Sequence, residues 1–244
     1  MGRAPEHPRE IVKDLVGDYR KAYGDAVVSV IMYGSAASGD YVPGASDINL
    51  MIVLSEDGIE ALDRAVPVVS KWRKRNVATP LLLTEAYIHT SLDVFPLEYL
   101  NFRNSYEVVY GKDVLAELKF DAKLLRLQCE REVKGKLLLL REGFLEADGK
   151  DRHIRELLCD SLHAFVAIFK GLLYIKEQDL PAKDRIVISR LCETVGLDVG
   201  AFEAIVDIKE KRIKPAGAEL EKLFKSYLKE IRKLWQIVDD LYAK

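Results

Sequence analysis

The chain has few of the features that mark specialised proteins by composition alone. Among its 244 residues there are only three cysteines, Cys129, Cys159 and Cys192, and no two of them form a Cys-x-x-Cys pair. This spacing disfavours zinc and redox sites, and the thiols are expected to be buried. Three unpaired thiols are typical of a reducing compartment, so we expect a cytoplasmic protein.

A strong net charge and long apolar runs are also lacking. The formal net charge is -2, which gives no global attraction to nucleic acid. The longest apolar runs are only a few residues long, as in Leu137 to Leu140, so no membrane-spanning segment is expected. The first ten residues carry charges and two prolines without an apolar centre, which is unlike a signal peptide.

Residues 1–115 combine the apolar patterns of helices and strands. Helical spacing of apolar residues predicts helices over 8–23 and 57–74, and Thr84 is suited to cap a short helix that ends near His89. Apolar, β-branched runs predict strands over 27–33, 47–54, 80–83, 94–102 and 106–110. Pro96 argues that the strand over 94–102 is an edge strand or pairs only after the proline.

The pattern changes after residue 115. Apolar residues at spacings of three and four predict long helices over 119–147, 151–177, 183–196 and 216–243. We therefore predict a mixed α/β (α+β) domain over 1–115, with a small mixed sheet and flanking helices, and an all-α helical bundle over 116–244.

One constellation in the first half carries chemistry. An apolar strand leads into Gly34 and Ser35, and a second apolar strand begins near Asp47 and Asn49. A glycine at a strand end lets the backbone approach a phosphate closely, and a helix that opens after it adds unpaired N–H donors. Residues 47 and 49 project from the same face because side chains alternate along a strand. Two carboxylates placed in this way can hold divalent metals beside a triphosphate.

The stretch from Gly34 to Leu54 resembles the Gly-Ser and Asp-x-Asp signature of the polymerase-β-type nucleotidyltransferase superfamily. It is most similar to the antibiotic (aminoglycoside) nucleotidyltransferases and the minimal nucleotidyltransferases, and the former also carry a helical C-terminal domain. The resemblance implies that Gly34, Ser35 and Ser46 bind the nucleotide and that Asp47 binds Mg²⁺. A third carboxylate is implied on a later strand between apolar residues, where Glu98 fits best and Asp93 is the alternative.

This sequence departs from the signature at one metal position, where Asn49 replaces a carboxylate. An amide oxygen can coordinate Mg²⁺ but is neutral, so a two-metal site is weakened or reduced to one metal held by Asp47, Asn49 and Glu98. The resemblance implies Mg²⁺-dependent transfer of a nucleoside monophosphate, AMP from ATP or another nucleoside triphosphate, to a hydroxyl-bearing acceptor. Glu98 or Asp93 would serve as general base. The acceptor is expected to dock between the domains.

Two other functions stay open. The domain can be a degenerate module that binds a nucleotide or a partner without turnover. Alternatively, Arg155 and His163 are similar to the Arg and His pair of the helical ribonuclease toxins that partner minimal nucleotidyltransferases, which would make the chain a toxin–antitoxin-type fusion. The basic residues from Lys209 to Lys214 are expected at a solvated helix end, and a homodimer is left open.

Overall fold

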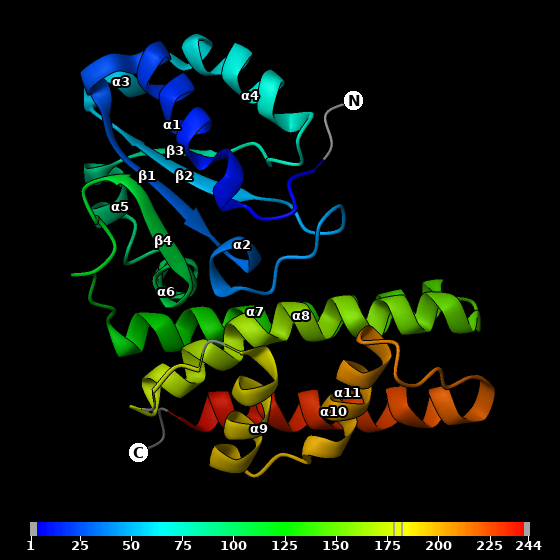
Figure 1. Cartoon of the computed structure of the whole chain (residues 1–244). Helices are drawn as coiled ribbons and strands as arrows, with labels where there is room; N and C mark the ends of the chain where they lie inside the picture. Colours follow the sequence, from blue (N-terminus) through cyan, green and yellow to red (C-terminus); the bar gives the residue numbers. More distant parts are fainter. Residues whose placement is uncertain (1–3, 178, 182, 242–244) are drawn as a thin grey trace. The chain divides into compact units, whose positions relative to one another are not determined.

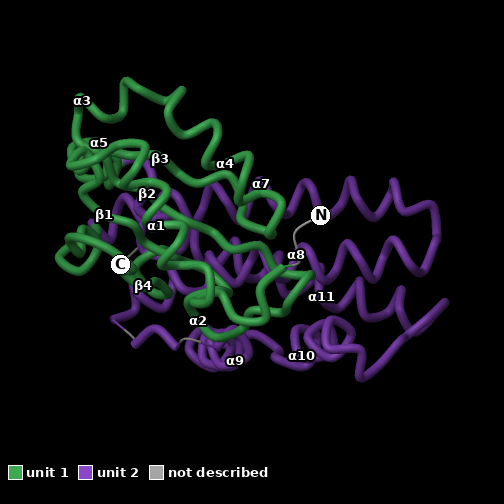
Figure 2. The backbone as a smooth tube through the Cα atoms, turned by 45° about the horizontal axis from the view of Figure 1, so that its top comes forward, with its two compact units in different colours: residues 1–93, 102–120 green, residues 94–101, 121–244 purple. Residues whose placement is uncertain are grey.

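The computed structural model describes residues 4–177, 179–181 and 183–241 and divides the chain into two compact units. The sheet unit comprises Met1–Asp93 and Phe102–Phe120, and the helical unit comprises Val94–Asn101 and Asp121–Lys244 (Figure 2). The sequence placed a single boundary at residue 115, whereas the structure draws residues 94–101 out of the first unit and into the second.

The sheet unit contains the small mixed sheet that the sequence predicts. Its four strands are β1 (Val27–Tyr33), β2 (Asn49–Leu54), β3 (Leu81–Thr84) and β4 (Tyr106–Gly111). They lie in the order β3-β2-β1-β4, with β1 antiparallel to both β2 and β4 and with β2 parallel to β3 (Figure 1). β3 and β4 are therefore the two edges of the sheet.

Short and long helices flank this sheet. They are α1 (Arg9–Tyr23), α2 (Ser35–Ser38), α3 (Glu56–Ile59), α4 (Ala65–Arg73) and α5 (Glu85–Thr90). The single helix predicted over 57–74 is wrong, because α3 ends at Ile59 and a 3₁₀ turn precedes α4. Pro67 is the physical reason: it has no N–H to donate inside a long helix but is tolerated in the first turn of α4.

Both faces of the central strands are buried. Val30 and Ile52 belong to the same core cluster as Leu15 of α1 and Trp72 of α4, so these two helices cover one face (Figure 1). Ile31, whose side chain points to the opposite face, is also fully buried. Burial on two faces explains why these strands are continuously apolar instead of alternating.

The strand predicted over 94–102 is wrong, because this segment forms helix α6 (Pro96–Asn104). Pro96 occupies the first helical position, where its missing N–H costs nothing and its fixed φ favours a helix. The N–H of Leu97 has no acceptor within the helix because it lies in the first turn. It donates instead to Oε1 of the buried Gln128 over 2.8 Å. The apolar run therefore reflects burial of Leu97, Tyr99 and Leu100 on a helix and not a strand pattern.

Five helices make up most of the helical unit: α7 (Ala122–Glu146), α8 (Asp151–Ile175), α9 (Asp184–Val195), α10 (Val199–Lys209) and α11 (Gly217–Asp240). The helical region is confirmed, but the sequence prediction missed α10. Residues 242 and 243 of the predicted last helix lie outside the described residues. Four aromatic rings, Phe165, Phe169, Phe202 and Tyr227, contact one another in the core of this unit.

Helix α8 is long and apolar enough, by length and composition alone, to cross a membrane, which contradicts the expectation that no segment is. Half of its most apolar window is buried inside the structure. Phe165, Ile168 and Phe169 face the core of the helical unit and are fully buried. A central helix of a bundle passes the same test, and we interpret α8 in that way.

Candidate functional site

The loop after β1 has a backbone geometry that would let a phosphate group approach closely. Gly34 has a φ of 72° and a ψ of -147°, which is accessible essentially to glycine alone. Its N–H donates to the carbonyl of Ser105, and its own carbonyl accepts from Ala37 and Ser38 in the short helix α2. Within the described part of the chain, the N–H groups of Ser35 and Ala36 have no hydrogen-bond acceptor. These two amides are available to an anion.

The start of β2 lies beside this loop. Asn49 pairs with Tyr33 at the end of β1, and its Nδ2 lies 3.5 Å from the point where a Cβ on Gly34 would be. Asp47 is exposed and lies two residues before the start of the strand. The loop residues Gly34 and Ser35 and the pair Asp47 and Asn49 therefore meet at one end of the sheet, as the sequence spacing predicts.

Ser46 has a structural contact that the sequence did not predict. Its hydroxyl accepts from the N–H of Val42 over 3.1 Å, and its own N–H donates to the carbonyl of Val42. The side chain of Asn76 also donates to the carbonyl of Ser46. Ser46 closes the turn over residues 42–46, which precedes Asp47. Its hydroxyl is therefore already engaged in a hydrogen bond within this turn.

Neither candidate for the third carboxylate lies on a strand. Glu98 is in the first turn of α6, in the helical unit, where its carboxylate accepts from Nε2 of Gln128. Asp93 is exposed in the turn that follows α5. The segment beside Asn49 runs between Val77, which pairs with Ile48, and Leu81, which begins β3 and pairs with Met51. It consists of Ala78, Thr79 and Pro80 and holds no carboxylate.

A strand carboxylate that the sequence analysis missed is Glu107, between Tyr106 and Val108 on β4. It lies opposite Met32, whose side chain is in the core beneath α1, whereas Asn49 lies opposite Tyr33. Neighbours along β1 point to opposite faces, so Glu107 and Asn49 are on different faces. Arg9 of α1 donates to Glu107 through two nitrogens. Glu107 therefore does not complete a site with Asp47.

The side chains at the loop fit fewer metal ions than the signature implies. Nowhere in 4–177, 179–181 and 183–241 do three His, Cys, Asp or Glu side chains form a group able to hold a metal ion. One carboxylate and one amide oxygen, from Asp47 and Asn49, fit a single divalent cation that completes its shell with phosphate oxygens and water. They do not fit two metals that share anionic ligands.

The surroundings of the loop are acidic. Tyr41 donates its hydroxyl to the carbonyl of Pro5, and its pKa is raised first by burial and then by the charges of Glu10, Glu6 and Asp47. Asp40 accepts from the hydroxyl of Ser38 at the end of α2. A triphosphate bound at the loop would therefore meet negative charge, and a cation is needed to offset the repulsion.

The residues behind the ribonuclease alternative do not form a pair. Arg155 and His163 are both on α8, but eight residues correspond to a rise of about 12 Å along a helix. Arg155 donates to the carbonyl of Pro215, and His163 is exposed. Within the basic cluster, Arg212 pairs with Asp207 and Glu210, so part of its charge is compensated.

Comparison with known proteins finds a matching family model and a similar fold. Residues 9–105 match the family model of the nucleotidyltransferase domain. The chain is also similar in structure to the spectinomycin adenyltransferase from Enterococcus faecialis, crystallised with ATP and spectinomycin, with a TM-score of 0.52 and 12% identity. This similarity covers 95% of this chain and 99% of the other, so the two share a fold over both units. No curated protein matches the sequence.

The family model begins at the first residue of α1 and ends just after α6, so it includes the Gly34–Ser35 loop and Asp47. The resemblance to polymerase-β-type nucleotidyltransferases is thereby confirmed. Residues 9–105 of this chain are a nucleotidyltransferase domain.

Proposed function

We propose that this protein binds ATP at the Gly34–Ser35 loop and transfers AMP to a hydroxyl group of a small acceptor. The observation that carries the proposal is the geometry of the loop: a glycine in a glycine-only conformation, two N–H groups after it that have no acceptor among the described residues, and Asp47 at the same end of the sheet. The shared fold with an enzyme crystallised with ATP and spectinomycin supports the reaction class.

In this reaction the acceptor oxygen attacks the α-phosphorus in line, the bond to the bridging oxygen breaks, and pyrophosphate leaves. The N–H groups of Ser35 and Ala36 would hold phosphate oxygens in position. Asp47 and Asn49 would hold one divalent cation, Mg²⁺ being the expected one, which supplies charge neutralisation when bound. The described strands beside Asn49 offer no carboxylate base, so the hydroxyl proton would pass to water, and we expect slow transfer.

A second function is favoured by a specific observation. Asn49 is neutral, and residues 78–80 beside it contain no carboxylate. A domain with a preserved phosphate loop and a single remaining carboxylate is suited to bind a nucleotide without turning it over.

Calorimetric titration of ATP with and without Mg²⁺ tests the binding step. We expect Mg²⁺-dependent binding to the native protein and its loss in Asp47→Ala. Asp25→Ala is the matched control, since it removes an exposed carboxylate of the same unit that precedes β1, at the end of that strand opposite to Gly34. Binding that survives in Asp47→Ala, or is lost equally in Asp25→Ala, would contradict the assignment.

Asn49→Asp separates transfer from binding alone. Release of pyrophosphate from ATP is measured with a panel of hydroxyl acceptors that includes spectinomycin. A rise of about tenfold or more in Asn49→Asp would indicate an intact site weakened by one missing charge. No pyrophosphate release by either protein, with ATP binding retained, would leave the binding module as the function.

A further inference from the structure

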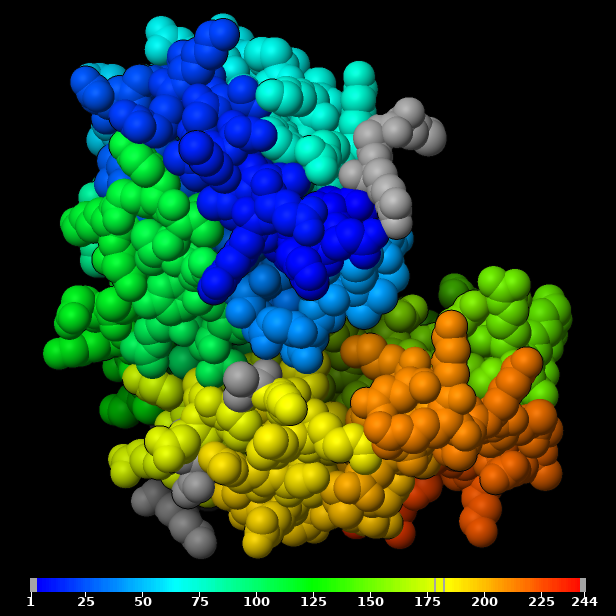
Figure 3. Space-filling view, viewed as in Figure 1, coloured from blue at the N-terminus to red at the C-terminus, as the bar shows by residue number. Residues whose placement is uncertain are grey.

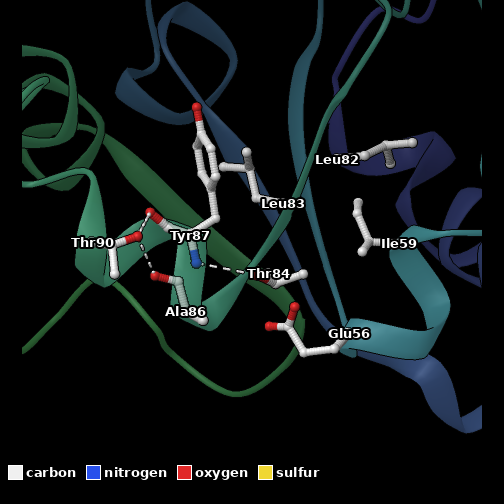
Figure 4. Close-up of a pocket in the computed structure, with 8 residues that line it drawn as sticks. All are labelled: Glu56, Ile59, Leu82, Leu83, Thr84, Ala86, Tyr87 and Thr90. Atoms are coloured by element: carbon white, nitrogen blue, oxygen red, sulfur yellow. Dashed lines mark hydrogen bonds between the residues drawn. The ribbon is translucent and has the colours of Figure 1, made fainter.

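A groove of about 600 Å³ runs along the outer side of β3 in the sheet unit. It lies at the far end of β2 from the phosphate loop, since Asp47 precedes the six residues of β2 and Glu56 follows them, a span of about 20 Å. β3 forms its floor, α3 one wall and α5 the other (Figure 4). Its lining residues are Glu56, Ile59, Leu82, Leu83, Thr84, Ala86, Tyr87 and Thr90.

The floor of the groove is an unpaired strand edge. β3 ends the sheet, and among the described residues no backbone hydrogen bond joins Leu81, Leu82 or Leu83 to any segment other than β2. Figure 4 shows Leu82 and Ile59 on one side of β3 and Leu83 beside the ring of Tyr87 on the other. An extended segment laid along β3 would therefore find backbone partners at its centre and apolar side chains on both sides.

The opposite edge of the sheet is protected in ways that β3 is not. β4 carries the charged residue Glu107, its pairing with β1 has a bulge, and Arg9 of α1 reaches it (Figure 3, where α1 is dark blue beside the green β4). Charged side chains and bulges are how proteins prevent an edge from pairing with other chains. β3 has three successive leucines and neither device, and Leu81 and Tyr87 are 37% and 50% exposed. Of the two edges, β3 is therefore the one that can pair with an added strand.

Packing and helix caps within the sheet unit hold both walls of the groove in place. In α3, a Cβ on Gly58 would lie 2.9 Å from Cβ of Ala26, so the glycine allows the wall to pack closely. Ser55 caps the same helix. In α5, Thr84 accepts from the N–H of Tyr87, and Ile88 is fully buried. A groove with fixed walls binds an extended segment without first paying the cost of ordering itself.

Charge decides between the possible occupants. Glu56 is the only charged residue in the lining, it has no ion pair among the described residues, and the exposed Asp57 and Glu60 belong to the same wall segment. A second copy of this chain docked edge to edge would bring two such acidic walls together, which like charges disfavour. We propose that the β3 groove binds an extended, lysine- or arginine-containing segment of a partner protein as an added strand.

The test uses a phage-displayed library of random ten-residue peptides selected on the full-length protein. We expect enriched peptides with apolar residues at alternate positions and at least one Lys or Arg. Binding of a synthetic enriched peptide is then measured by fluorescence anisotropy. We expect Tyr87→Ala to weaken it about tenfold, since an exposed aromatic wall is a typical anchor, and Glu56→Lys to weaken it and reduce its salt dependence.

Two controls make the result specific to strand addition. Leu139→Ala on α7 removes a side chain that is 63% exposed elsewhere, and should leave the affinity unchanged. N-methylation of alternate peptide amides should abolish binding in one register only, because just one set faces β3. The proposal is overturned if no peptide is enriched, if Tyr87→Ala binds as well as the native protein, or if sedimentation shows a dimer that Leu83→Lys dissociates.

Discussion

The backbone conformation of Gly34 determines which N–H groups are left for a ligand. Its φ of 72° and ψ of -147° are closed to residues with a Cβ, and this conformation turns the chain from β1 into α2. The turn leaves the N–H groups of Ser35 and Ala36 pointing away from any acceptor in the described residues. The glycine therefore creates the proposed anion-binding surface by geometry and not by charge.

Gly34→Ala is expected to destabilise the protein by about 1–3 kcal/mol, the usual range for a residue forced into such a conformation, and to abolish ATP binding. Thermal unfolding and calorimetry measure the two effects. Gly17→Ala is the matched control: Gly17 is inside α1 and a Cβ there meets nothing within 4 Å. It should stabilise the protein by roughly 0.5–1 kcal/mol and leave ATP binding intact. Equal behaviour of the two variants would contradict this reading of Gly34.

The three thiols differ in reactivity because they differ in burial. Burial raises the pKa of Cys129 above its ordinary range and, with the nearby Glu230, raises that of Cys192 to about 12, while Cys159 is only partly buried. The thiolate is the reactive form, so iodoacetamide at pH 8 should modify Cys159 first. Peptide mass mapping across a urea series checks the order. Modification of Cys129 before unfolding would show that its burial is not maintained.

Among the elements, α6 differs most from the expectation, since a helix stands where a strand is predicted. The mostly apolar segment over 94–102 predicts a strand, but Pro96 at the first helical position and the buried Gln128 select a helix. Gln128 accepts from the N–H of Leu97 and donates to the carboxylate of Glu98, so one side chain satisfies two groups of the first turn. Glu98 is accordingly the hydrogen-bond partner of a buried amide.

Gln128→Ala should therefore lower the free energy of unfolding by about 1–3 kcal/mol, since it leaves a buried N–H without an acceptor. Urea unfolding followed by circular dichroism measures the change. Gln236→Ala, an exposed glutamine on α11, is the control and should be neutral to within about 0.5 kcal/mol. A neutral Gln128→Ala would mean that the first turn of α6 finds other acceptors.

Much of the sheet unit could be predicted because its signals are local. The apolar runs that became β1 and β2, and the glycine and aspartate between them, depend on short-range geometry. Which residues stand where a third carboxylate is expected could not be predicted, because this depends on which segment lies beside β2. Residues 78–80, which hold no carboxylate, lie next to Asn49, and Glu98 belongs to the helical unit. The prediction missed α10 for a different reason: this helix is largely buried and lacks a clear polar face.

At the scale of the whole molecule, each unit has its own tryptophan. Trp72 is in the core of the sheet unit, and Trp235 is on α11 of the helical unit. Each can report the unfolding of its own unit once the other is replaced by phenylalanine. The two reporters make the site of ligand binding measurable without knowing the reaction.

ATP and Mg²⁺ should shift the unfolding transition seen by Trp72 in Trp235→Phe, by about 2.7 kcal/mol when ATP is present at 100 times its dissociation constant. If the units unfold separately, the transition seen by Trp235 in Trp72→Phe should stay where it is. If they unfold together, both transitions shift equally. A shift confined to Trp235 would place the nucleotide in the helical unit and reject the proposed loop site.

The division of the chain has an evolutionary consequence. The backbone passes from one unit to the other after residues 93, 101 and 120, so residues 94–101 are encoded inside the sheet unit but packed in the helical one. A single recombination event at residue 120 would deliver a helical unit without its Leu97, which lies against the space that Gly171 leaves open. A helical unit exchanged at this point would therefore have to supply its own side chain for the space beside Gly171.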